Sequence, residues 1–240
     1  MRIVRAKKFK NKSDIKKFYD ECGWVVLKNY VKRSEIKDIQ TSLDSFFYKN
    51  IKKNFLNSLV YLNKKNKKKL HKLHMQSSNL TSIKRVCTRL SEIQKILLGK
   101  KDILVYEIST TYALSLPKDK RLVYDYHQES NYMKKYGDIL NIHFPIFHQS
   151  NFENGSMSAL SKSHKLDNLN YNYKRKSNNS YTDMIPKNIK EIVKNYEEVL
   201  FELNVGDVVF FHKDLIHKSN FNSTKNCRPV GIGRYTSSYE

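Results

Sequence analysis

The spacing of apolar residues changes once along the chain, near Asp102, and this change limits the possible folds more than any other feature. Before it, apolar residues such as Ile36, Ile39 and Leu43 recur at the spacing that places them on one face of a helix. After it, apolar residues form short runs or alternate with polar ones, which is typical of strands. Helices followed by many short strands predict an α+β, mainly β fold: a double-sheet jelly-roll barrel with an N-terminal helical layer.

The predicted elements divide the chain into a helical layer over residues 1–100 and a barrel over residues 101–240. We expect helices at residues 15–21, from Ser34 onward and around 90–97, and strands at residues 24–27, 103–108, 121–126, 139–147, 157–160, 199–203, 208–211 and 231–235. The lysine run at 64–69 has no apolar periodicity, so we expect an exposed connector there. Residues 165–194 are rich in Asn, Lys, Tyr and Ser and are predicted to be a long insertion that ends in a short helix near 189–196.

Composition limits the number of domains and the kinds of partner. The chain has 240 residues, of which 39% are hydrophobic, enough to bury the core of one domain over residues 1–240. Its 45 basic and 23 acidic residues give a net charge of +22, as found in proteins that bind nucleic acids or anionic membranes. The excess is mostly lysine and no nucleic-acid motif accompanies it. We therefore interpret it as lysine spread over solvated faces and expect no specific nucleic-acid partner.

The cysteines and the hydropathy pattern indicate the compartment. Cys22, Cys87 and Cys227 are odd in number, widely spaced and without a C-x-x-C pattern, which argues against a disulfide framework and for a reducing compartment. No apolar segment follows the basic N-terminus, and no run approaches the roughly 18 apolar residues of a membrane span. We expect a cytoplasmic protein without a membrane span.

A His-x-Glu triplet, His127 to Glu129, follows a predicted strand, and residues i and i+2 of a strand point to the same face. One imidazole and one carboxylate on one face supply two-thirds of a 2-His-1-carboxylate site for Fe(II), which leaves three coordination positions open. The third ligand should be a histidine at the end of a distant strand. His217 is the best candidate and His212 its main rival, because His217 begins a His-x-Ser pattern and precedes Arg228 by eleven residues.

Arg228 lies at the start of the next apolar strand, and an arginine that points into a small barrel is costly to bury unless an anion meets it. The guanidinium fork matches a carboxylate in a bidentate manner. A metal triad beside such an arginine suits a cosubstrate that chelates iron at one end and carries a carboxylate at the other. 2-Oxoglutarate is that molecule.

Five other histidines have simpler interpretations. His71 and His74 can share a helix face but lack an acidic neighbour, so we expect surface histidines. His143 and His148 face opposite sides by odd–even spacing and cannot both bind one metal. His164 is expected to make a hydrogen bond within a turn.

Four segments together resemble the phytanoyl-CoA dioxygenase family of Fe(II)- and 2-oxoglutarate-dependent oxygenases. They are residues 18–28 (FYDECGWVVLK), 126–129 (YHQE), 153–165 (ENGSMSALSKSHK) and 206–219 (GDVVFFHKDLIHKS). These are similar to the family's dGyvvl element, its HQD metal motif, its eNGal…lpGSHk element and its GDvvfFh…lhHgS element. The order and spacing of all four make the match specific. The resemblance covers most of the chain and implies a double-stranded β-helix, the cupin-like form of the jelly roll.

Carried over residue by residue, the resemblance makes His127, Glu129 and His217 the ligands of Fe(II). The family's usual Asp is Glu129 here, whose additional methylene requires a different rotamer, although its hard oxygen donor should preserve metal binding. A carboxylate at this position argues against halogenation, which relatives without that carboxylate carry out. Residues 161–164 lack the family's usual Pro-Gly before Ser-His, so we expect a different turn there.

The resemblance also implies residues for the cosubstrate and the substrate. Arg228 would bind the distal carboxylate of 2-oxoglutarate, with help from the Ser219 hydroxyl. Phe144 falls where many relatives carry an aromatic residue that lines the cosubstrate pocket, although the segment 142–147 is equally compatible with a core strand. Tyr132, just after the metal motif, is assigned to the substrate side.

The activity implied is hydroxylation of an unactivated C–H bond of a small organic substrate, with consumption of O₂ and release of succinate and CO₂. The lysine-rich insertion at residues 165–194 predicts an anionic substrate, either phosphate-bearing or carrier-tethered. One alternative is a non-catalytic barrel that serves as a binding or regulatory module, as the Glu substitution and the basic surface would allow. A nucleic-acid-directed hydroxylase is a further alternative, supported by net charge alone.

Overall fold

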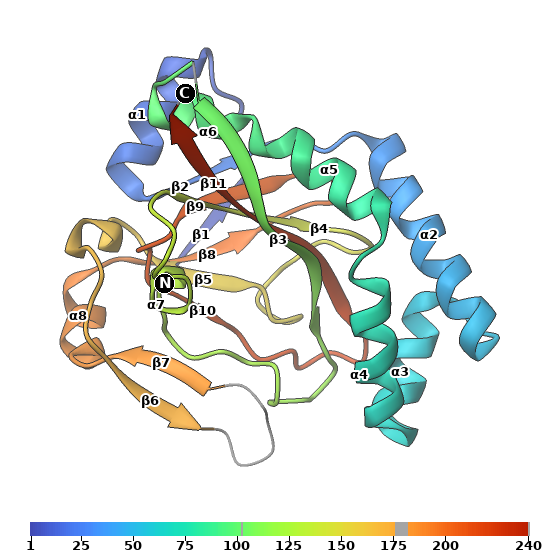
Figure 1. The fold of residues 1–240 in the computed structure, drawn as a ribbon. Coiled ribbons are helices and arrows are strands. Elements are labelled where there is room, and N and C mark those ends of the chain that lie inside the picture. The colour runs from blue at the N-terminus through green and yellow to red at the C-terminus, as the bar shows by residue number, and fades with distance from the viewer. Residues whose placement is uncertain (102, 176–181, 240) are drawn as a thin grey trace.

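The computed structural model describes residues 1–101, 103–175 and 182–239 (Figure 1). The helices are α1 (Lys12–Cys22), α2 (Arg33–Ile51), α3 (Phe55–Lys65), α4 (Lys67–Ser77), α5 (Thr81–Ser91), α6 (Ile93–Leu98), α7 (Glu129–Tyr132), the 3-10 helix η1 (Ser163–Leu166) and α8 (Ile189–Asn195). The strands are β1 (Arg2–Arg5), β2 (Trp24–Leu27), β3 (Ile103–Ser115), β4 (Ile139–Pro145), β5 (Met157–Leu160), β6 (Tyr171–Arg175), β7 (Thr182–Pro186), β8 (Glu198–Glu202), β9 (Val208–His212), β10 (His217–Ser219) and β11 (Arg228–Tyr239).

Two sheets form the centre of the molecule. One has the strand order β1-β8-β5-β10 and the other β2-β9-β4-β11-β3. Only β1 and β8 pair in parallel; every other neighbouring pair of described strands in these sheets is antiparallel. The hairpin of β6 and β7 stands apart from both. Two facing, mainly antiparallel sheets beside a helical layer confirm the predicted jelly-roll-like core.

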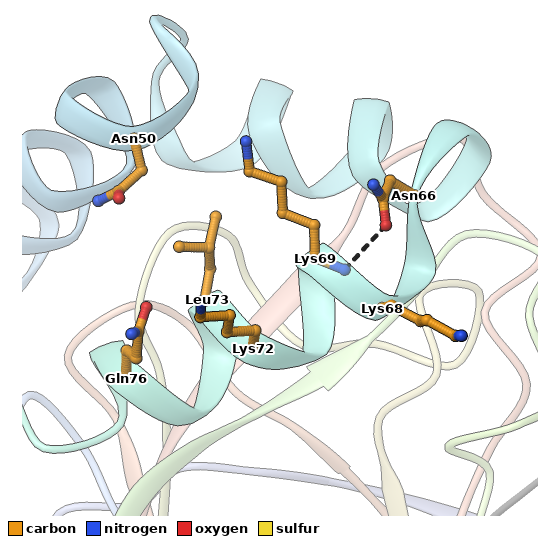
Figure 2. A pocket seen from close by; sticks show the side chains of 7 residues that line it. All are labelled: Asn50, Asn66, Lys68, Lys69, Lys72, Leu73 and Gln76. Carbon is orange, nitrogen blue, oxygen red and sulfur yellow. Dashed lines mark hydrogen bonds between the residues drawn. The ribbon is translucent and has the colours of Figure 1, made fainter.

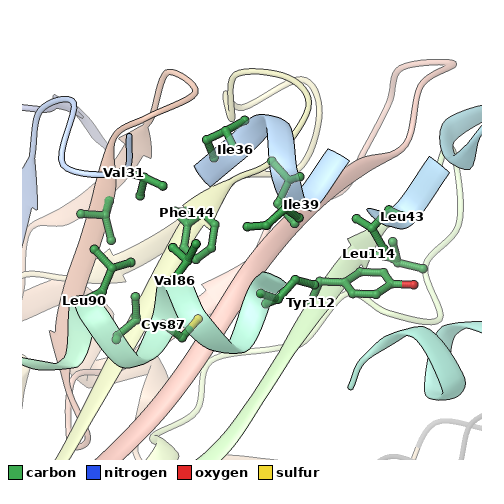
Figure 3. Packing of buried hydrophobic residues seen from close by; sticks show 14 of the residues in the cluster. Val31, Ile36, Ile39, Leu43, Val86, Cys87, Leu90, Tyr112, Leu114 and Phe144 are labelled. Atoms are coloured by element: carbon green, nitrogen blue, oxygen red, sulfur yellow. The ribbon is translucent and has the colours of Figure 1, made fainter. Parts of the chain in front are cut away.

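Strand alternation separates two hydrophobic cores. On β2, Trp24 and Val26 point toward the four-stranded sheet and pack with residues such as Phe201. Val25 and Leu27 point the other way, toward the helices. The second core lies between the five-stranded sheet and helices α2 to α6 (Figure 3). Successive side chains of β2 therefore point into different hydrophobic cores.

The helical layer is bounded by local signals that the sequence carries. The side chain of Asn11 accepts a hydrogen bond from the backbone N–H of Asp14, which caps α1. Gly23 ends α1 with a φ of 78°, and a Cβ atom there would lie 2.4 Å from Nδ1 of His164. Glycine is thus required both by the backbone and by the close approach of the η1 turn. None of the described helices is long and apolar enough to cross a bilayer.

Three differences between the structure and the sequence predictions lie near the candidate site or in the lysine-rich segments. Residues 121–126 form turns and coil and not a strand. The lysine run at 64–69 belongs to two helices, α3 and α4, which are separated only by Asn66. The insertion contains the β6–β7 hairpin as well as α8, and its residues 176–181 lie outside the described part of the chain.

Candidate metal centre

Three buried side chains from distant parts of the chain converge between the sheets. The backbone N–H of His127 donates to the carbonyl of His217 (3.0 Å), and the N–H of His217 donates to the carbonyl of His127 (3.1 Å). This bridge places the two ring centroids 4.2 Å apart. Oε1 of Glu129 lies 3.9 Å from Nε2 of His127 and 3.7 Å from Nε2 of His217. Among the described residues, no other group of three His, Cys, Asp or Glu side chains brings its ligand atoms within 4.8 Å of one another.

The backbone positions these residues differently from the strand geometry expected for His-x-Glu. His127 lies in coil and is held in place by its bridge to His217, the first residue of β10. Glu129 is the first residue of the short helix α7. The triplet therefore presents two side chains to one point through a strand-like bridge followed by a helical turn.

Both histidines are oriented by hydrogen bonds from their other ring nitrogen. Nδ1 of His127 lies 2.7 Å from the carbonyl oxygen of Asp125, and Nδ1 of His217 lies 2.9 Å from that of Leu215. A carbonyl can only accept, so each Nδ1 carries the proton and each Nε2 presents a lone pair to the centre. Burial, reinforced by the nearby His217, lowers the pKa of His127 to about 3, so this imidazole is neutral.

The carboxylate of Glu129 is held by Arg234 of β11. Nε of Arg234 donates to Oε2 of Glu129 (2.9 Å) and Nη2 donates to Oε1 (3.0 Å). Burial raises the pKa of Glu129, but the charge of Arg234 and the hydrogen bonds to this carboxylate outweigh it, so this pKa lies well below its ordinary value. No role was predicted for Arg234 from the sequence. Its even spacing from Arg228 along one strand, 234 − 228 = 6, places both on the same face and could have indicated a place in the site.

Gln128, between the two candidate ligands, connects three segments. Its fully buried Nε2 donates to the carbonyls of Asp167 (2.7 Å) and Asp214 (2.8 Å), and its Oε1 accepts from the backbone N–H of Leu169 (3.0 Å). These bonds join the His127 loop to the segment after η1 and to the turn that precedes β10. The Gln128 amide therefore has a structural role, because all of these partners are backbone groups of the neighbouring segments.

Arg228 is buried at the start of β11, with one nitrogen available. Its Nε donates to the carbonyl of Asn154 (3.0 Å) and its Nη2 to that of Gly155 (2.6 Å). Its Nη1 is buried and has no hydrogen-bond partner among the described residues. Burial lowers the pKa of Arg228 to about 10. A buried, charged N–H without an acceptor marks a position where a carboxylate oxygen fits. Ser219 lies on β10 two residues after His217, on the same face by strand alternation.

Phe144, which the resemblance assigns to the cosubstrate pocket, packs in the core cluster that contains the five-stranded sheet and the helices. Its ring is fully buried between the five-stranded sheet and the helices (Figure 3). Strand alternation turns the preceding residue, His143, to the opposite face. There, burial and the positive charge of Arg228 lower the pKa of His143 to about 3. His143, which sequence reasoning set aside, is therefore on the face of β4 that is turned toward the candidate site.

Tyr132 connects the metal centre to the insertion. Its ring lies edge-on to the ring of His127, with centroids 5.8 Å apart. Its hydroxyl accepts from the backbone N–H of Met184 (3.0 Å) and donates to the carbonyl of Thr182 (3.3 Å). The β6–β7 hairpin is thereby docked beside the candidate site through Tyr132.

The rival ligand, His212, lies apart from the triad. Its Nδ1 is 3.6 Å from Oδ2 of Asp214, and its ring contacts that of His164 with centroids 5.4 Å apart. Nε2 of His164 lies 3.1 Å from the carbonyl oxygen of Asp20, so its hydrogen bond reaches α1, and not a residue of its own turn as predicted. These side chains hold the end of β9 against α1.

Two surface hollows lie away from the triad. The first, of about 520 Å³, is formed by α2, α3 and α4 (Figure 2). Its lining residues are Asn50, Asn66, Lys68, Lys69, Lys72, Leu73 and Gln76. The second, of about 550 Å³, is lined by Ser13, Lys16, Lys17, Asp20, Glu21 and Lys165. Neither includes a residue of the metal centre, so we assign the chemistry to the triad.

Comparisons with known proteins agree with this geometry. The sequence model of the phytanoyl-CoA dioxygenase (PhyH) family matches residues 19–230. No curated protein sequence matches the chain significantly. Among solved structures, EctD from S. alaskensis with 2-oxoglutarate and 5-hydroxyectoine is similar with a TM-score of 0.64 and 16% identity, over 96% of this chain and 79% of that one.

Two enzymes of nogalamycin biosynthesis are similar as well. The epimerase SnoN, in complex with Fe³⁺, alpha ketoglutarate and nogalamycin RO, has a TM-score of 0.63 and 15% identity, over 95% of this chain and 86% of that one. The carbocyclase SnoK has a TM-score of 0.57 and 16% identity, over 95% of this chain and 85% of that one. At these identities the likeness establishes a common fold.

Proposed function

The chain belongs to the phytanoyl-CoA dioxygenase family, and from this premise we propose that it is an Fe(II)- and 2-oxoglutarate-dependent oxygenase that hydroxylates a small organic substrate. The observation that carries the proposal is the convergence of His127, Glu129 and His217 at one buried point. Two imidazole nitrogens and one carboxylate oxygen are the donor set of the facial triad that binds non-heme Fe(II) and leaves positions open.

The residues present also fit the cosubstrate. Arg228 keeps a buried Nη1 without an acceptor among the described residues, and this guanidinium would bind the distal carboxylate of 2-oxoglutarate. We assign the Ser219 hydroxyl as a second donor to that carboxylate. His143 also faces this site from β4. Because its imidazole is neutral, it adds no charge beside the cosubstrate.

Bound together, Fe(II) and 2-oxoglutarate supply the means to activate O₂, with succinate and CO₂ as the products of cosubstrate oxidation. The chain contributes orientation and exclusion of water. Its two Nδ1–carbonyl hydrogen bonds aim both Nε2 atoms at one point, and Tyr132 covers His127 from the side of the hairpin. For hydroxylation the balance is one substrate C–H, one O₂ and one 2-oxoglutarate giving one alcohol, one succinate and one CO₂.

We infer a polar or anionic substrate, phosphate-bearing or carrier-tethered. Oδ1 of Asn141, on the same face of β4 as His143, is buried without a hydrogen-bond partner among the described residues. Lys174 belongs to the hairpin that Tyr132 anchors, and Lys134 lies over the ring of Tyr171 in that hairpin.

We further propose one domain over residues 1–240, since a single core cluster contains residues of both the helices and the sheet. The free cysteines Cys22, Cys87 and Cys227 are consistent with a cytoplasmic location.

An anaerobic visible spectrum of the purified protein tests the cofactor assignment. We expect a weak charge-transfer band that needs both Fe(II) and 2-oxoglutarate and is lost in Arg228→Ala. We expect His217→Ala to abolish decarboxylation of 2-oxoglutarate. Bound Fe(II) without the band would favour a non-catalytic barrel. Unchanged turnover in His217→Ala would overturn the assignment of His217 as a metal ligand.

Hydroxylation itself requires a separate experiment, because the similar structures include an epimerase and a carbocyclase. Candidate organic anions would be incubated with the enzyme under ¹⁸O₂, and products analysed by mass spectrometry. Hydroxylation adds one labelled oxygen atom to the product. A product of unchanged mass would show an isomerisation, and one that has only lost two hydrogens would show a desaturation or ring closure, so either would contradict hydroxylation.

A further inference from the structure

Among the described residues, Arg234 alone donates hydrogen bonds to both oxygens of the candidate carboxylate ligand. Its Nε and Nη2 bind Oε2 and Oε1 of Glu129 at 2.9 and 3.0 Å, the parallel geometry of a bidentate pair. The Glu129 side chain is 7% exposed and that of Arg234 20% exposed. Two short bonds in a mostly buried setting fix the plane of the carboxylate, since both oxygens would have to move together to leave it.

The length of Glu129 gives this contact a specific purpose. A glutamate has one more rotatable bond than an aspartate, so its carboxylate can occupy more positions at the same backbone site. In the observed pose Oε1 faces both Nε2 atoms, at 3.9 Å from His127 and 3.7 Å from His217. Arg234 therefore selects, from the larger set of glutamate rotamers, the one that brings a single oxygen to the two histidines.

The position of Arg234 in the sheet makes it a rigid support. It lies on β11, between β4 and β3, with Asn141 as its Cα partner on β4 and Ser109 on β3. The pairing with β3 shifts immediately afterwards, because Tyr235 pairs with Glu107. Such an irregularity increases the local twist and is frequent next to functional sites. Paired on both edges, the backbone at Arg234 holds the guanidinium in a fixed place.

We propose that Arg234 is a positioning residue that makes the longer Glu129 usable as a metal ligand by directing Oε1 at the centre between His127 and His217. The inference rests on the proposed metal site and goes beyond it, because it assigns the geometry of the carboxylate to a residue 105 positions away. Among the described residues, the side chain of Arg234 forms no hydrogen bond with a ring nitrogen of His127 or His217. It acts on the centre through Glu129.

The two effects of Arg234 on metal binding have opposite signs, which makes the proposal sharply testable. Its positive charge repels a divalent cation, so removal of the charge alone would tighten metal binding. Its hold on Glu129 organises a ligand, so loss of that hold would weaken metal binding. A weakened affinity both in a neutral variant and in one that keeps the positive charge therefore indicates lost positioning, provided that the protein remains folded.

The experiment is a titration of the apo protein with Co(II), followed by its visible absorption, in wild type, Arg234→Gln and Arg234→Lys. We expect both variants to bind Co(II) about 10- to 100-fold more weakly, the range typical when a residue supporting a metal ligand is replaced. Lysine keeps the charge but cannot form the fork, so it should not restore affinity. Unchanged or tighter binding in Arg234→Gln, or full affinity in Arg234→Lys, would overturn the proposal.

Arg89→Gln is the matched control. Arg89 makes the same kind of bidentate pair with Glu35, at 2.6 and 2.8 Å, between α5 and α2. Its loss should affect stability in a similar way and leave Co(II) affinity at the wild-type value. Circular dichroism of each variant establishes that it is folded. Equal weakening in Arg89→Gln and Arg234→Gln would show a general loss of structure and would contradict a specific role for Arg234.

A variant without the carboxylate separates positioning from other effects. In Glu129→Ala, Arg234 has no ligand to position and only its charge acts, so adding Arg234→Gln should no longer weaken Co(II) binding. Further weakening in the double variant would contradict the proposal. Failure of the proposed function would be seen differently: wild type would bind Co(II), while Fe(II) and 2-oxoglutarate together would give no charge-transfer band.

Discussion

The ring of Phe144 lies so close to the backbone of Gly231 that a Cβ atom there would be 2.2 Å from ring carbon Cζ. Glycine on β11 thus makes room for an aromatic side chain on β4, on the helix-facing side of the sheet. This complementary fit indicates a packing role for Phe144. Because side chains alternate along a strand, the preceding residue, His143, points to the opposite face of the sheet, toward the candidate metal centre.

We predict that Phe144→Leu lowers the free energy of unfolding by about 1–2 kcal/mol, because it leaves part of a fully buried site unfilled. The dissociation constant of the Fe(II)–protein complex for 2-oxoglutarate should stay unchanged, since the ring faces away from Arg228. Urea unfolding and a spectroscopic titration measure the two quantities. A large loss of 2-oxoglutarate affinity with little loss of stability would restore Phe144 to the cosubstrate pocket.

At this scale the sequence carried the identity of His127, Glu129 and His217, because ligand type and strand-end position are both visible in the chain. It did not carry the pairing of Glu129 with Arg234, since a contact across 105 residues depends on how β11 is registered against its neighbours. Even spacing places Arg228 and Arg234 on one face only if both residues lie in the same strand. β11 contains both, whereas the predicted strand covered only residues 231–235.

Helix α4 docks on β3 through a histidine that sequence reasoning assigned to the surface. Nε2 of His74 donates to the carbonyl of Tyr112 (2.8 Å), and the two rings lie with centroids 4.6 Å apart. Burial lowers the pKa of His74, outweighing this hydrogen bond. The folded protein therefore resists protonation of this imidazole, whereas the unfolded chain takes up a proton near the ordinary pKa of about 6.5.

The sign of the pH effect follows from this difference. Below about pH 6.5 the unfolded state binds more protons than the folded state at His74, so stability falls as pH falls. We predict that His74→Gln reduces the loss of unfolding free energy between pH 7 and pH 5, by at most about 1.4 kcal/mol per pH unit. His148→Gln, an exposed position away from this contact, is the control and should behave as wild type. Equal pH slopes in wild type and His74→Gln would contradict the prediction.

Elements with strong local signals were predictable, and those fixed by tertiary contacts were not. The strands at Trp24–Leu27 and Met157–Leu160 match their predicted bounds because apolar runs are framed there by turn residues. The lysine run at 64–69 was misjudged, because the apolar residues that anchor α3 and α4 lie outside it and Asn66 both ends one helix and caps the next. The segment 121–126 has a strand-like composition but no neighbouring strand to pair with in the described sheets.

For the whole molecule, the single change in apolar period anticipated the layered architecture: helices α2 to α6 cover one face of the five-stranded sheet (Figure 1). The sequence could not place the charge. The net charge of +22 is carried partly by lysines of α4 that line the hollow in Figure 2, away from the metal centre. Arg228 and Arg234, in contrast, are screened from solvent by the barrel. Two populations of positive charge therefore act over different distances.

These populations should respond differently to salt. The Debye length falls from about 30 Å at 0.01 M to about 8 Å at 0.15 M ionic strength, so the long-range attraction of surface lysines for an anion is lost over this range. Contacts within the barrel are screened much less. We predict that KM for the dianion 2-oxoglutarate rises by up to about tenfold, while kcat stays nearly constant. KM for O₂, which is uncharged, is the internal control and should not change. If KM for 2-oxoglutarate were equally insensitive to salt, the lysine excess would play no part in capturing the cosubstrate, and the buried Arg228 alone would account for its binding.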